Sequence, residues 1–391
     1  MQRQPVGKIK TIIKYRYWLM IKVLPVVALL IFMSASCGTP DVPAGGDTVV
    51  ITDLLGREVS VPANVEKVVG VRAGALRMLV YMDAVSLIAG VEEPERNSAR
   101  PYMLAYYELA GLPAIGPVMG GDAEMILNVN PDVIFTTYST VQDANELQAK
   151  TGIPVVALEC RDLGTETATL YSSFELIGKI TGKEKRADEL ISFISDTMED
   201  LDERTSGIPD EMKPSVYAGG LSYSTSYGIS STHPAYAPFL FINAENVASG
   251  IDERLASHVK GTFIDTEQLM LWNPDYLFID QSGFPLAAGE FKTKPALRRT
   301  LDASREGNIF NLLPYNDYAT NYEFVLLNAW FAGKQVYPGN FEDICIEEKS
   351  QEILSFFYGK PVKPEKVVSS PVFQRFAACE KNGLIKTEES E

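Results

Sequence analysis

The chain contains two similar stretches, DAEMILNVNPDVIFT at residues 122–136 and DTEQLMLWNPDYLFI at residues 265–279. In each, a short helical pattern carries a glutamate, Glu124 or Glu267, and is followed by Asn-Pro-Asp and then by an apolar run. Proline ends a helix because it lacks a backbone N–H and restricts the residue before it. Each stretch therefore predicts a short helix that leads into a buried strand. Their repetition predicts two lobes of similar construction.

A long amphipathic helix is expected between the two stretches. From Lys183 to about Arg204, apolar residues recur at spacings of three and four, which keeps one helical face apolar. Thr181 and Glu184 predict a capping box at its start, and Gly207 is expected to end it. Such a helix would be about 33 Å long and would join the two lobes as a stiff linker.

Short β-rich runs alternate with helical patterns along the rest of the chain. Strands are expected at residues 68–71, 133–137, 155–158, 216–218, 276–280 and 309–312. Strands that alternate with helices are typical of α/β architecture. The expected fold class is therefore α/β.

The N-terminus has the features of a secretory signal peptide. Residues 1–22 hold six basic and no acidic residues, residues 23–33 are apolar, and small residues precede Cys37. An apolar run of 11 residues is short for a membrane-spanning helix. The cysteine after small residues resembles a lipobox, which predicts cleavage before Cys37 and lipid on its sulfur. Ser34 replaces the leucine usual in that motif, and an uncleaved membrane anchor is the alternative.

The charge balance excludes one class of partner. The chain has 35 basic and 51 acidic residues, and removal of residues 1–36 would leave only 29 basic ones. Nucleic-acid binding needs a basic footprint, which this composition does not supply. The acidic balance suits an extracytoplasmic body held off an anionic membrane surface.

Beyond Cys37, the chain has three cysteines, Cys160, Cys345 and Cys379. Export permits a disulfide, and Cys345 with Cys379 is the pair to test. Three isolated thiols are the alternative.

Several short motifs occur in a fixed order between about Val49 and Pro338. They are DLLGREV at 53–59 with Pro62, EKVV at 66–69, the two Glu…Asn-Pro-Asp stretches, and ENVA at 245–248. In order and spacing they resemble the periplasmic binding proteins of ABC importers for iron–siderophore complexes, haem, vitamin B12 and, in some members, molybdate. The resemblance implies two Rossmann-like α/β lobes joined by one long helix, with a rigid hinge, a ligand cleft between the lobes, and a monomeric state.

The expected organisation follows from these motifs and from the N-terminus. It is a signal peptide (1–36), a lipid-anchored tether (37–47), an N-terminal lobe (48–182), a linking helix (183–206), a C-terminal lobe (207–340) and a C-terminal extension (341–391) to which the sequence assigns no role.

The resemblance also implies a docking role for two glutamates. In the family, a surface glutamate on each lobe docks to arginines of the permease, and Glu124 and Glu267 lie at the matching positions. Two well-separated carboxylates on one face would give orientation as well as attraction. The alternative is that each carboxylate only favours the first turn of its helix through the helix dipole.

Candidate ligand residues lie in loops after the expected strands, where open α/β sheets bind ligands. They are Arg72, Tyr138, Arg161, Tyr223, Tyr227, His233, Tyr315 and Tyr318. Tyrosine rings offer a flat apolar surface with a polar group, and arginines pair with anions. The mixture suits an aromatic or macrocyclic anion. The alternative is that these tyrosines pack near strand ends and that His233 is structural.

The histidine count limits the metal chemistry. The chain has only His233 and His258, so a three-histidine site for a bare zinc or manganese ion is excluded. A metal would therefore arrive as a metal chelate or oxyanion, and no resident cofactor is expected. The favoured ligand is an iron–siderophore complex or haem, followed by a corrinoid and then by molybdate.

Two other functional classes are an enzyme and a ligand scavenger. The sequence has no Gly-x-Ser-x-Gly elbow, no His-Glu-x-x-His motif and no phosphate-binding Gly-rich loop, so an enzyme is not expected. The remaining alternative is a ligand scavenger that acts without a permease.

Overall fold

The computed structural model describes residues 47–96, 98–223, 225–251 and 262–364. The residues in these ranges belong to one compact unit. Within the described ranges, no helix has both the length and the apolar character needed to cross a membrane. The expected signal peptide, Cys37 and nearly all of the expected tether lie outside these ranges.

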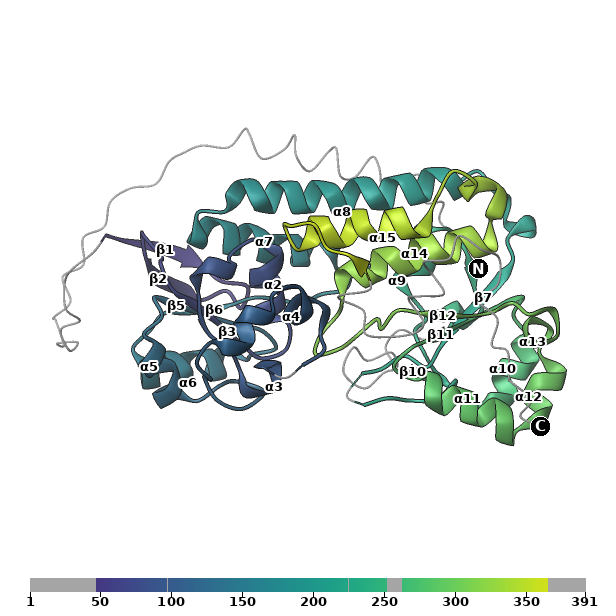
Figure 1. Cartoon of the computed structure of the whole chain (residues 1–391), viewed down its shortest axis with the longest axis horizontal. Coiled ribbons are helices and arrows are strands. Elements are labelled where there is room, and N and C mark those ends of the chain that lie inside the picture. The colour runs from purple at the N-terminus through teal and green to yellow at the C-terminus, as the bar shows by residue number, and fades with distance from the viewer. Residues whose placement is uncertain (1–46, 97, 224, 252–261, 365–391) are drawn as a thin grey trace, which may run out of the picture. The chain divides into compact units, whose positions relative to one another are not determined.

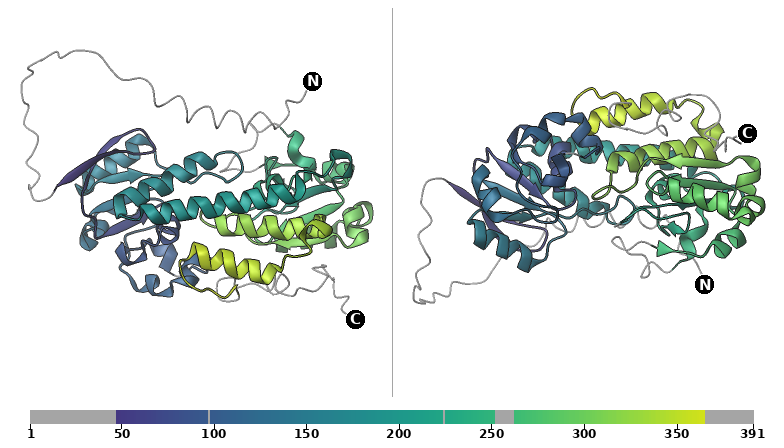
Figure 2. Two further views of the ribbon diagram at one scale, coloured as in Figure 1. Left: turned by 90° about the horizontal axis from the view of Figure 1, so that it is seen from above. Right: turned by 60° about the horizontal axis from the view of Figure 1, so that its bottom comes forward.

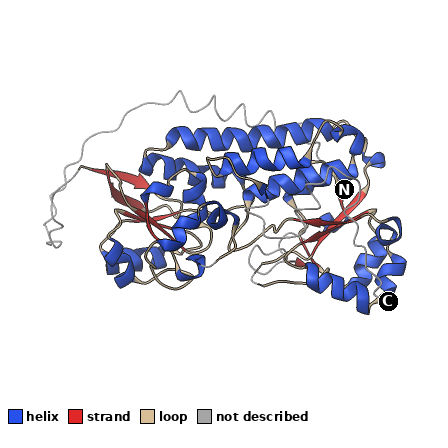
Figure 3. Cartoon of the chain, viewed as in Figure 1, coloured by secondary structure: helices blue, strands red, loops and turns tan. Residues whose placement is uncertain are grey.

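Two parallel sheets with surrounding helices make up the α/β fold (Figures 1 and 3). Their strand orders are β4-β3-β5-β6 and β9-β7-β11-β12. In both sheets, the first strand along the chain lies between the second and the third. The first lobe is built on the first sheet and the second lobe on the second. The shared order confirms the prediction of an α/β fold with two lobes of similar construction.

The six expected strands are present, each within one residue of its predicted ends. The strands of the two sheets are β3 (Val68–Val71), β4 (Ile88–Gly90), β5 (Val133–Thr136), β6 (Val155–Ala157), β7 (Ser215–Gly219), β9 (Glu245–Asn246), β11 (Tyr276–Asp280) and β12 (Ile309–Leu312). Two antiparallel pairs lie beside the sheets: β1 (Thr48–Thr52) with β2 (Glu58–Pro62), and β8 (Ser231–Thr232) with β10 (Thr262–Phe263).

Helices connect the strands in both lobes. The first lobe has α2 (Ala75–Tyr81), α3 (Glu93–Arg96), α4 (Pro101–Ala105), α5 (Ala123–Val129), α6 (Val141–Thr151) and α7 (Thr167–Thr181). The second lobe has α9 (Ala237–Phe241), α10 (Thr266–Trp272), α11 (Phe284–Thr293), α12 (Pro295–Thr300), α13 (Asp302–Glu306) and α14 (Tyr322–Val336).

The expected linking helix is α8 (Glu184–Thr205), which runs past both lobes (Figure 2). Its apolar face is buried, as the spacing predicted, with Leu190 and Ile194 fully covered. The predicted capping box is wrong. Thr181 is the last residue of α7, and its hydroxyl donates to the carbonyl oxygen of Ile177 (2.7 Å). The predicted boundaries of the lobes stay predictions.

The Asn-Pro-Asp of each repeat has the same structural role. Its asparagine ends the helix in the left-handed conformation, with φ 48° after α5 and 44° after α10, which asparagine tolerates well. The carboxylate of Asp132 then accepts a hydrogen bond from the N–H of Lys67 (2.8 Å), just before β3. The carboxylate of Asp275 accepts one from the N–H of Ser215 (2.8 Å), the first residue of β7. Each aspartate thereby fixes the start of the first strand of its parallel sheet.

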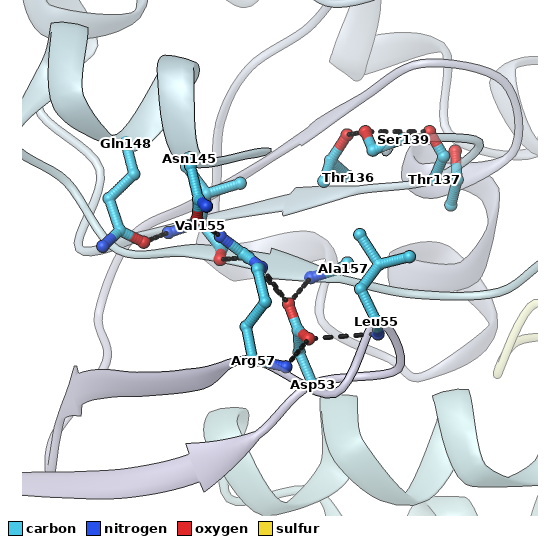
Figure 4. Close-up of polar contacts among 10 residues, drawn as sticks. All are labelled: Asp53, Leu55, Arg57, Thr136, Thr137, Ser139, Asn145, Gln148, Val155 and Ala157. Carbon is cyan, nitrogen blue, oxygen red and sulfur yellow. Dashed lines mark hydrogen bonds and ion pairs between the residues drawn. The ribbon is translucent and has the colours of Figure 1, made fainter. Parts of the chain in front are cut away.

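A buried ion pair attaches the β1–β2 hairpin to the first sheet (Figure 4). The carboxylate of Asp53 accepts hydrogen bonds from the Arg57 guanidinium (2.7 Å) and from the N–H groups of Leu55 (3.0 Å) and Ala157 (3.1 Å). Arg57 also donates to the side chain of Asn145 (2.8 Å). A buried charge is tolerated when it is paired and hydrogen-bonded in this way. The DLLGREV motif therefore acts structurally in this chain.

Candidate ligand site

Arg72 and Tyr138 lie side by side at the carboxyl end of the first sheet. They follow β3 and β5, neighbouring strands from which the chain continues to opposite edges of the sheet, and open α/β sheets bind ligands at such a point. Both residues have left-handed backbone, with φ 71° and 46°, which is uncommon for residues other than glycine. The Arg72 guanidinium donates to the carbonyl oxygen of Tyr138 (2.9 Å) and lies 3.5 Å from the carboxylate of Asp143. Its side chain stays 20% exposed, so it can still be reached from solvent.

Glu92 joins three segments around Arg72. Glu92 is 2% exposed, and its carboxylate accepts hydrogen bonds from the N–H groups of Arg72 and Gly120 (both 3.1 Å) and from the hydroxyl of Tyr318 (2.6 Å). The same hydroxyl accepts a hydrogen bond from the N–H of Met119 (3.3 Å). Burial and the bond to Glu92 raise the pKa of Tyr318, which keeps its hydroxyl protonated. Because Tyr318 follows β12, these bonds join a loop of the second lobe to the first lobe.

Two arginines of the first lobe hold the Tyr318 loop, which we define as residues 315–321. The Arg100 guanidinium lies over the Tyr318 ring (4.6 Å) and pairs with the carboxylate of Asp317 (3.1 Å). Arg77, on α2, is fully buried and donates to the carbonyl oxygens of Thr320 (2.7 Å) and Asp317 (2.6 Å). A planar guanidinium with fixed donors can satisfy two acceptors at once. The loop is thus held by charged groups from outside its own lobe.

Arg161 and Tyr315 have partners within the fold. The Arg161 guanidinium pairs with the carboxylates of Glu159 (3.0 Å) and Glu166 (3.3 Å), which neutralise its charge. Tyr315 is buried and packs against Tyr236, with 5.1 Å between ring centroids. Tyr318, three residues later, contacts the first lobe instead. The predicted ligand contacts of these residues stay predictions.

Tyr223, Tyr227 and His233 lie in the second lobe, on the segment that follows β7. The Tyr223 hydroxyl donates to a backbone carbonyl of β8 (3.0 Å), and the Tyr227 ring packs edge-on against Phe263 (4.7 Å). Nδ1 of His233 accepts a hydrogen bond from the N–H of Ala235 (3.1 Å). The structure therefore brings Arg72, Tyr138 and Tyr318 into one network of contacts. Tyr223, Tyr227 and His233 instead have partners within the second lobe.

Glu124 and Glu267 occupy equivalent exposed positions. Each lies in the first turn of its helix, α5 or α10, in the equivalent unit of its lobe. Asp122 caps α5 by accepting hydrogen bonds from the N–H groups of its first turn. A position in the first turn also fits the helix-dipole alternative, so the docking role stays a prediction.

The described ranges hold several residues of the types that can bind a metal, and the buried thiol of Cys160. Those ranges contain no group of three or more His, Cys, Asp or Glu residues arranged to hold a metal ion. Cys160 is buried beside the sulfur of Met78 (3.5 Å), and burial raises the pKa of its thiol to about 12. His258 and Cys379 fall outside the described ranges, so the Cys345–Cys379 pair stays a prediction.

Asp280 introduces a pH dependence into the second lobe. It ends β11, is fully buried, and accepts hydrogen bonds from the N–H groups of Ser282 (2.8 Å) and Tyr315 (2.7 Å). Burial raises its pKa from 3.8 to about 7, although these bonds oppose the rise. Between these two values the folded chain holds a proton that the unfolded chain has lost. This contribution to stability therefore decreases as the pH rises through that window.

We expect the free energy of unfolding to fall by about 2–3 kcal/mol more in the wild type than in Asp280→Asn between pH 5 and 7.5. Asparagine does not titrate. Its side chain accepts poorly from two N–H donors, which lowers the free energy of unfolding by an amount that does not depend on pH. Urea unfolding of both proteins at several pH values measures the difference. A difference that does not change with pH would contradict the prediction.

The comparison with known proteins identifies the class to which this fold and site belong. Residues 71–315, more than half of the chain, match the periplasmic binding protein family, and the chain belongs to that family. It is a solute-binding protein of the kind that serves ABC importers, which confirms the resemblance seen in the sequence motifs.

Individual relatives are distant. The molybdate-binding protein MolA of Haemophilus influenzae is 24% identical over 339 residues, which cover 81% of this chain and 92% of that protein. Its molybdate-bound structure has a TM-score of 0.64 and 21% identity, with 81% and 99% of the two chains covered. A periplasmic solute-binding protein from Veillonella parvula has a TM-score of 0.65 and 20% identity, with 82% and 96% covered. These structures share the fold with this chain.

Three residues that hold the Tyr318 loop were missed by the sequence analysis. Glu92, Arg77 and Arg100 all belong to the first lobe and contact the loop or its backbone. The one available signal was Arg77, a charged residue inside the apolar stretch ALRMLVY (75–81). Glu92 and Arg100 lie in charged segments, whose composition predicts an exposed surface.

Proposed function

We propose that the chain captures an anionic, metal-containing nutrient between its two lobes and delivers it to an ABC permease. The observation that carries this proposal is the position of Arg72, an accessible guanidinium at the switch point of the first sheet and next to the Tyr318 loop of the second lobe. A charged donor there suits anionic oxygen atoms. The first candidate is an iron–siderophore complex or haem, because tyrosine rings adjoin the charge.

Molybdate is the second candidate ligand. The similarity to MolA favours it, since the matched region covers most of this chain and most of MolA. A compact oxyanion would accept the same charge-assisted hydrogen bonds from Arg72. Both candidates share anionic oxygen atoms and differ in size and in aromatic surface.

The proposed route of delivery needs a membrane anchor and two docking residues. Lipid on Cys37 would hold the protein at the outer face of the cytoplasmic membrane, and the tether would let it move. Glu124 and Glu267 would then dock the two lobes onto the permease.

Native mass spectrometry of the chain from residue 38 onward tests the ligand. The folded protein is to be challenged separately with ferric siderophores, haem, cobalamin and molybdate. A bound mass that matches one of the first two, or molybdate, would support the corresponding candidate. A complex with cobalamin alone, or with none of the four, would contradict the proposal.

We expect Arg72→Gln to weaken binding of that ligand about tenfold or more, because a charge-assisted hydrogen bond contributes about 1.5–3 kcal/mol. Arg161→Gln should have a smaller effect, since Glu159 and Glu166 already neutralise its guanidinium. Arg305→Gln, which changes an exposed side chain on α13, is the control. Isothermal titration calorimetry compares the three, and equal affinities for Arg72→Gln and the control would contradict the assignment.

A further inference from the structure

The chain continues beyond the family match into a segment that runs back along α8. After α14, the chain forms the short helix η7 (Pro338–Phe341) and then α15 (Ile346–Phe357). In two views α15 lies beside α14 and α8 (Figures 1 and 2). We call residues 338–360 the brace. Most of the brace lies in the C-terminal extension (341–391), for which no role was expected.

One end of the brace is fastened where α8 enters the second lobe. The Arg204 guanidinium, near the end of α8, makes a double hydrogen bond to the carboxylate of Asp343 (2.7 and 2.9 Å). The Asn340 side chain donates to the carbonyl oxygen of Arg204 (2.6 Å). The same guanidinium lies over the ring of Trp330 on α14 (5.2 Å). Such two-point pairing fixes direction as well as distance.

The other end of the brace is fastened near the start of α8. The Arg186 guanidinium donates to the carbonyl oxygens of Phe356 (2.6 Å) and of Tyr81 on α2 (2.8 Å). The Phe356 ring stacks on that of Phe193, with centroids 3.9 Å apart. Arg186 and Arg204 are 18 residues apart on α8, which corresponds to about 27 Å of helix. The brace therefore spans much of the same length as α8.

The brace ends on the first lobe. The Tyr106 hydroxyl donates to the carbonyl oxygen of Tyr358 (2.5 Å), and the Lys360 ammonium lies 3.5 Å from the centre of the Tyr106 ring. The Phe357 ring packs edge-on against Tyr81 (4.9 Å). A segment that starts on the second lobe is thus anchored to the first by hydrogen bonds and by aromatic packing.

A buried carboxylate connects the brace to the Tyr318 loop. Glu323 is fully buried in the first turn of α14, directly after that loop. Its carboxylate accepts hydrogen bonds from the hydroxyls of Tyr358 (2.7 Å) and Tyr81. Tyr81 shares α2 with Arg77, which holds two carbonyl oxygens of the loop. The hydroxyl of Tyr358 therefore supports the base of the loop that reaches the candidate ligand site.

We propose that the brace is a second connection between the lobes and that it has the same function as α8. We also propose that Tyr358 is a positioning residue for the Tyr318 loop. The part that concerns ligand affinity rests on the proposed function. Two connections fastened at both ends resist bending more than one helix does. The brace thereby keeps the spacing of the lobes fixed and holds Tyr318 against Glu92.

Hydrogen exchange of the mature chain tests the positioning role without any ligand. The reporters are the hydrogen-bonded amides of Tyr315, Asp317 and Asn321. Tyr358→Phe and Phe356→Leu are expected to speed exchange at these amides about tenfold relative to the wild type. The matched control is Tyr217→Phe, which removes a buried hydroxyl that donates to Ile229 in the second lobe (2.7 Å). Unchanged exchange in both brace variants, or an equal change in the control, would overturn the proposal.

Binding of haem and of molybdate by the same variants separates this inference from the proposed function. Faster exchange together with weaker binding of either probe, about threefold or more, supports both. Faster exchange in a protein that binds neither probe supports the brace and counts against haem and molybdate as ligands. Unchanged exchange in a protein that binds a probe normally retains the proposed function and overturns the brace.

Discussion

Replacing Arg77 with leucine is expected to destabilise the folded chain by about 3–5 kcal/mol. The guanidinium is fully buried and donates to the carbonyl oxygens of Asp317 and Thr320. It also lies 5.0 Å from the centre of the Tyr102 ring. Leucine offers no donor, so both carbonyls lose a partner, and the buried charge of nearby Glu323 loses its compensation. Each of these losses is costly away from water.

Urea unfolding at neutral pH measures this effect. The stability of Arg77→Lys should lie between those of the wild type and Arg77→Leu. An ammonium group keeps the charge but does not reproduce the planar set of N–H donors of a guanidinium. Arg305→Leu removes an exposed arginine that pairs with Asp302 on α13 and should change stability by no more than about 0.5 kcal/mol. A loss below about 1 kcal/mol in Arg77→Leu would show that the buried contacts contribute little.

The main elements of the fold could be predicted because their signals are local. Short apolar runs give β5 and β11, and the spacing of Leu190, Ile194 and their neighbours gives α8. The Asn-Pro-Asp repeat marks the same helix–strand unit in both lobes, where an aspartate fixes an adjacent strand. Strands of two or three residues, such as β4 and β9, are too short to produce a readable period.

The candidate site was predicted only in part because its contacts are not local. Glu92 and Tyr318 are 226 residues apart in sequence, and no pattern near Glu92 indicates that its carboxylate is buried. Position after a strand placed Arg72 and Tyr138 among the candidates, and the structure brings the two together. The same rule does not distinguish Tyr315, which faces the core of its own lobe, from Tyr318, which reaches the other lobe. Tyr318 has left-handed backbone, with φ 53°, which the sequence does not indicate.

Reversing the charge of both Glu124 and Glu267 to arginine is expected to stop delivery to the permease while leaving ligand affinity unchanged. Both side chains are exposed and belong to equivalent units of the two lobes. An ion pair near a wet surface contributes about 1–4 kcal/mol, so losing two and replacing them with repulsion should lower permease affinity at least tenfold. The measurements are ligand uptake by proteoliposomes that contain the permease and calorimetric binding to the isolated protein.

The control and the single variants decide between docking and a purely local role. Glu199→Arg changes an exposed glutamate on α8 and should leave uptake intact. If the glutamates only favour the first turns of α5 and α10, each Glu→Gln change would cost about 0.3–1 kcal/mol of stability and leave uptake unaltered. In a scavenger that acts without a permease, the two Glu→Arg changes would likewise leave function unaltered. Loss of uptake at normal ligand affinity is therefore the outcome that only docking through both lobes explains, because neither helix stability nor ligand capture changes with it.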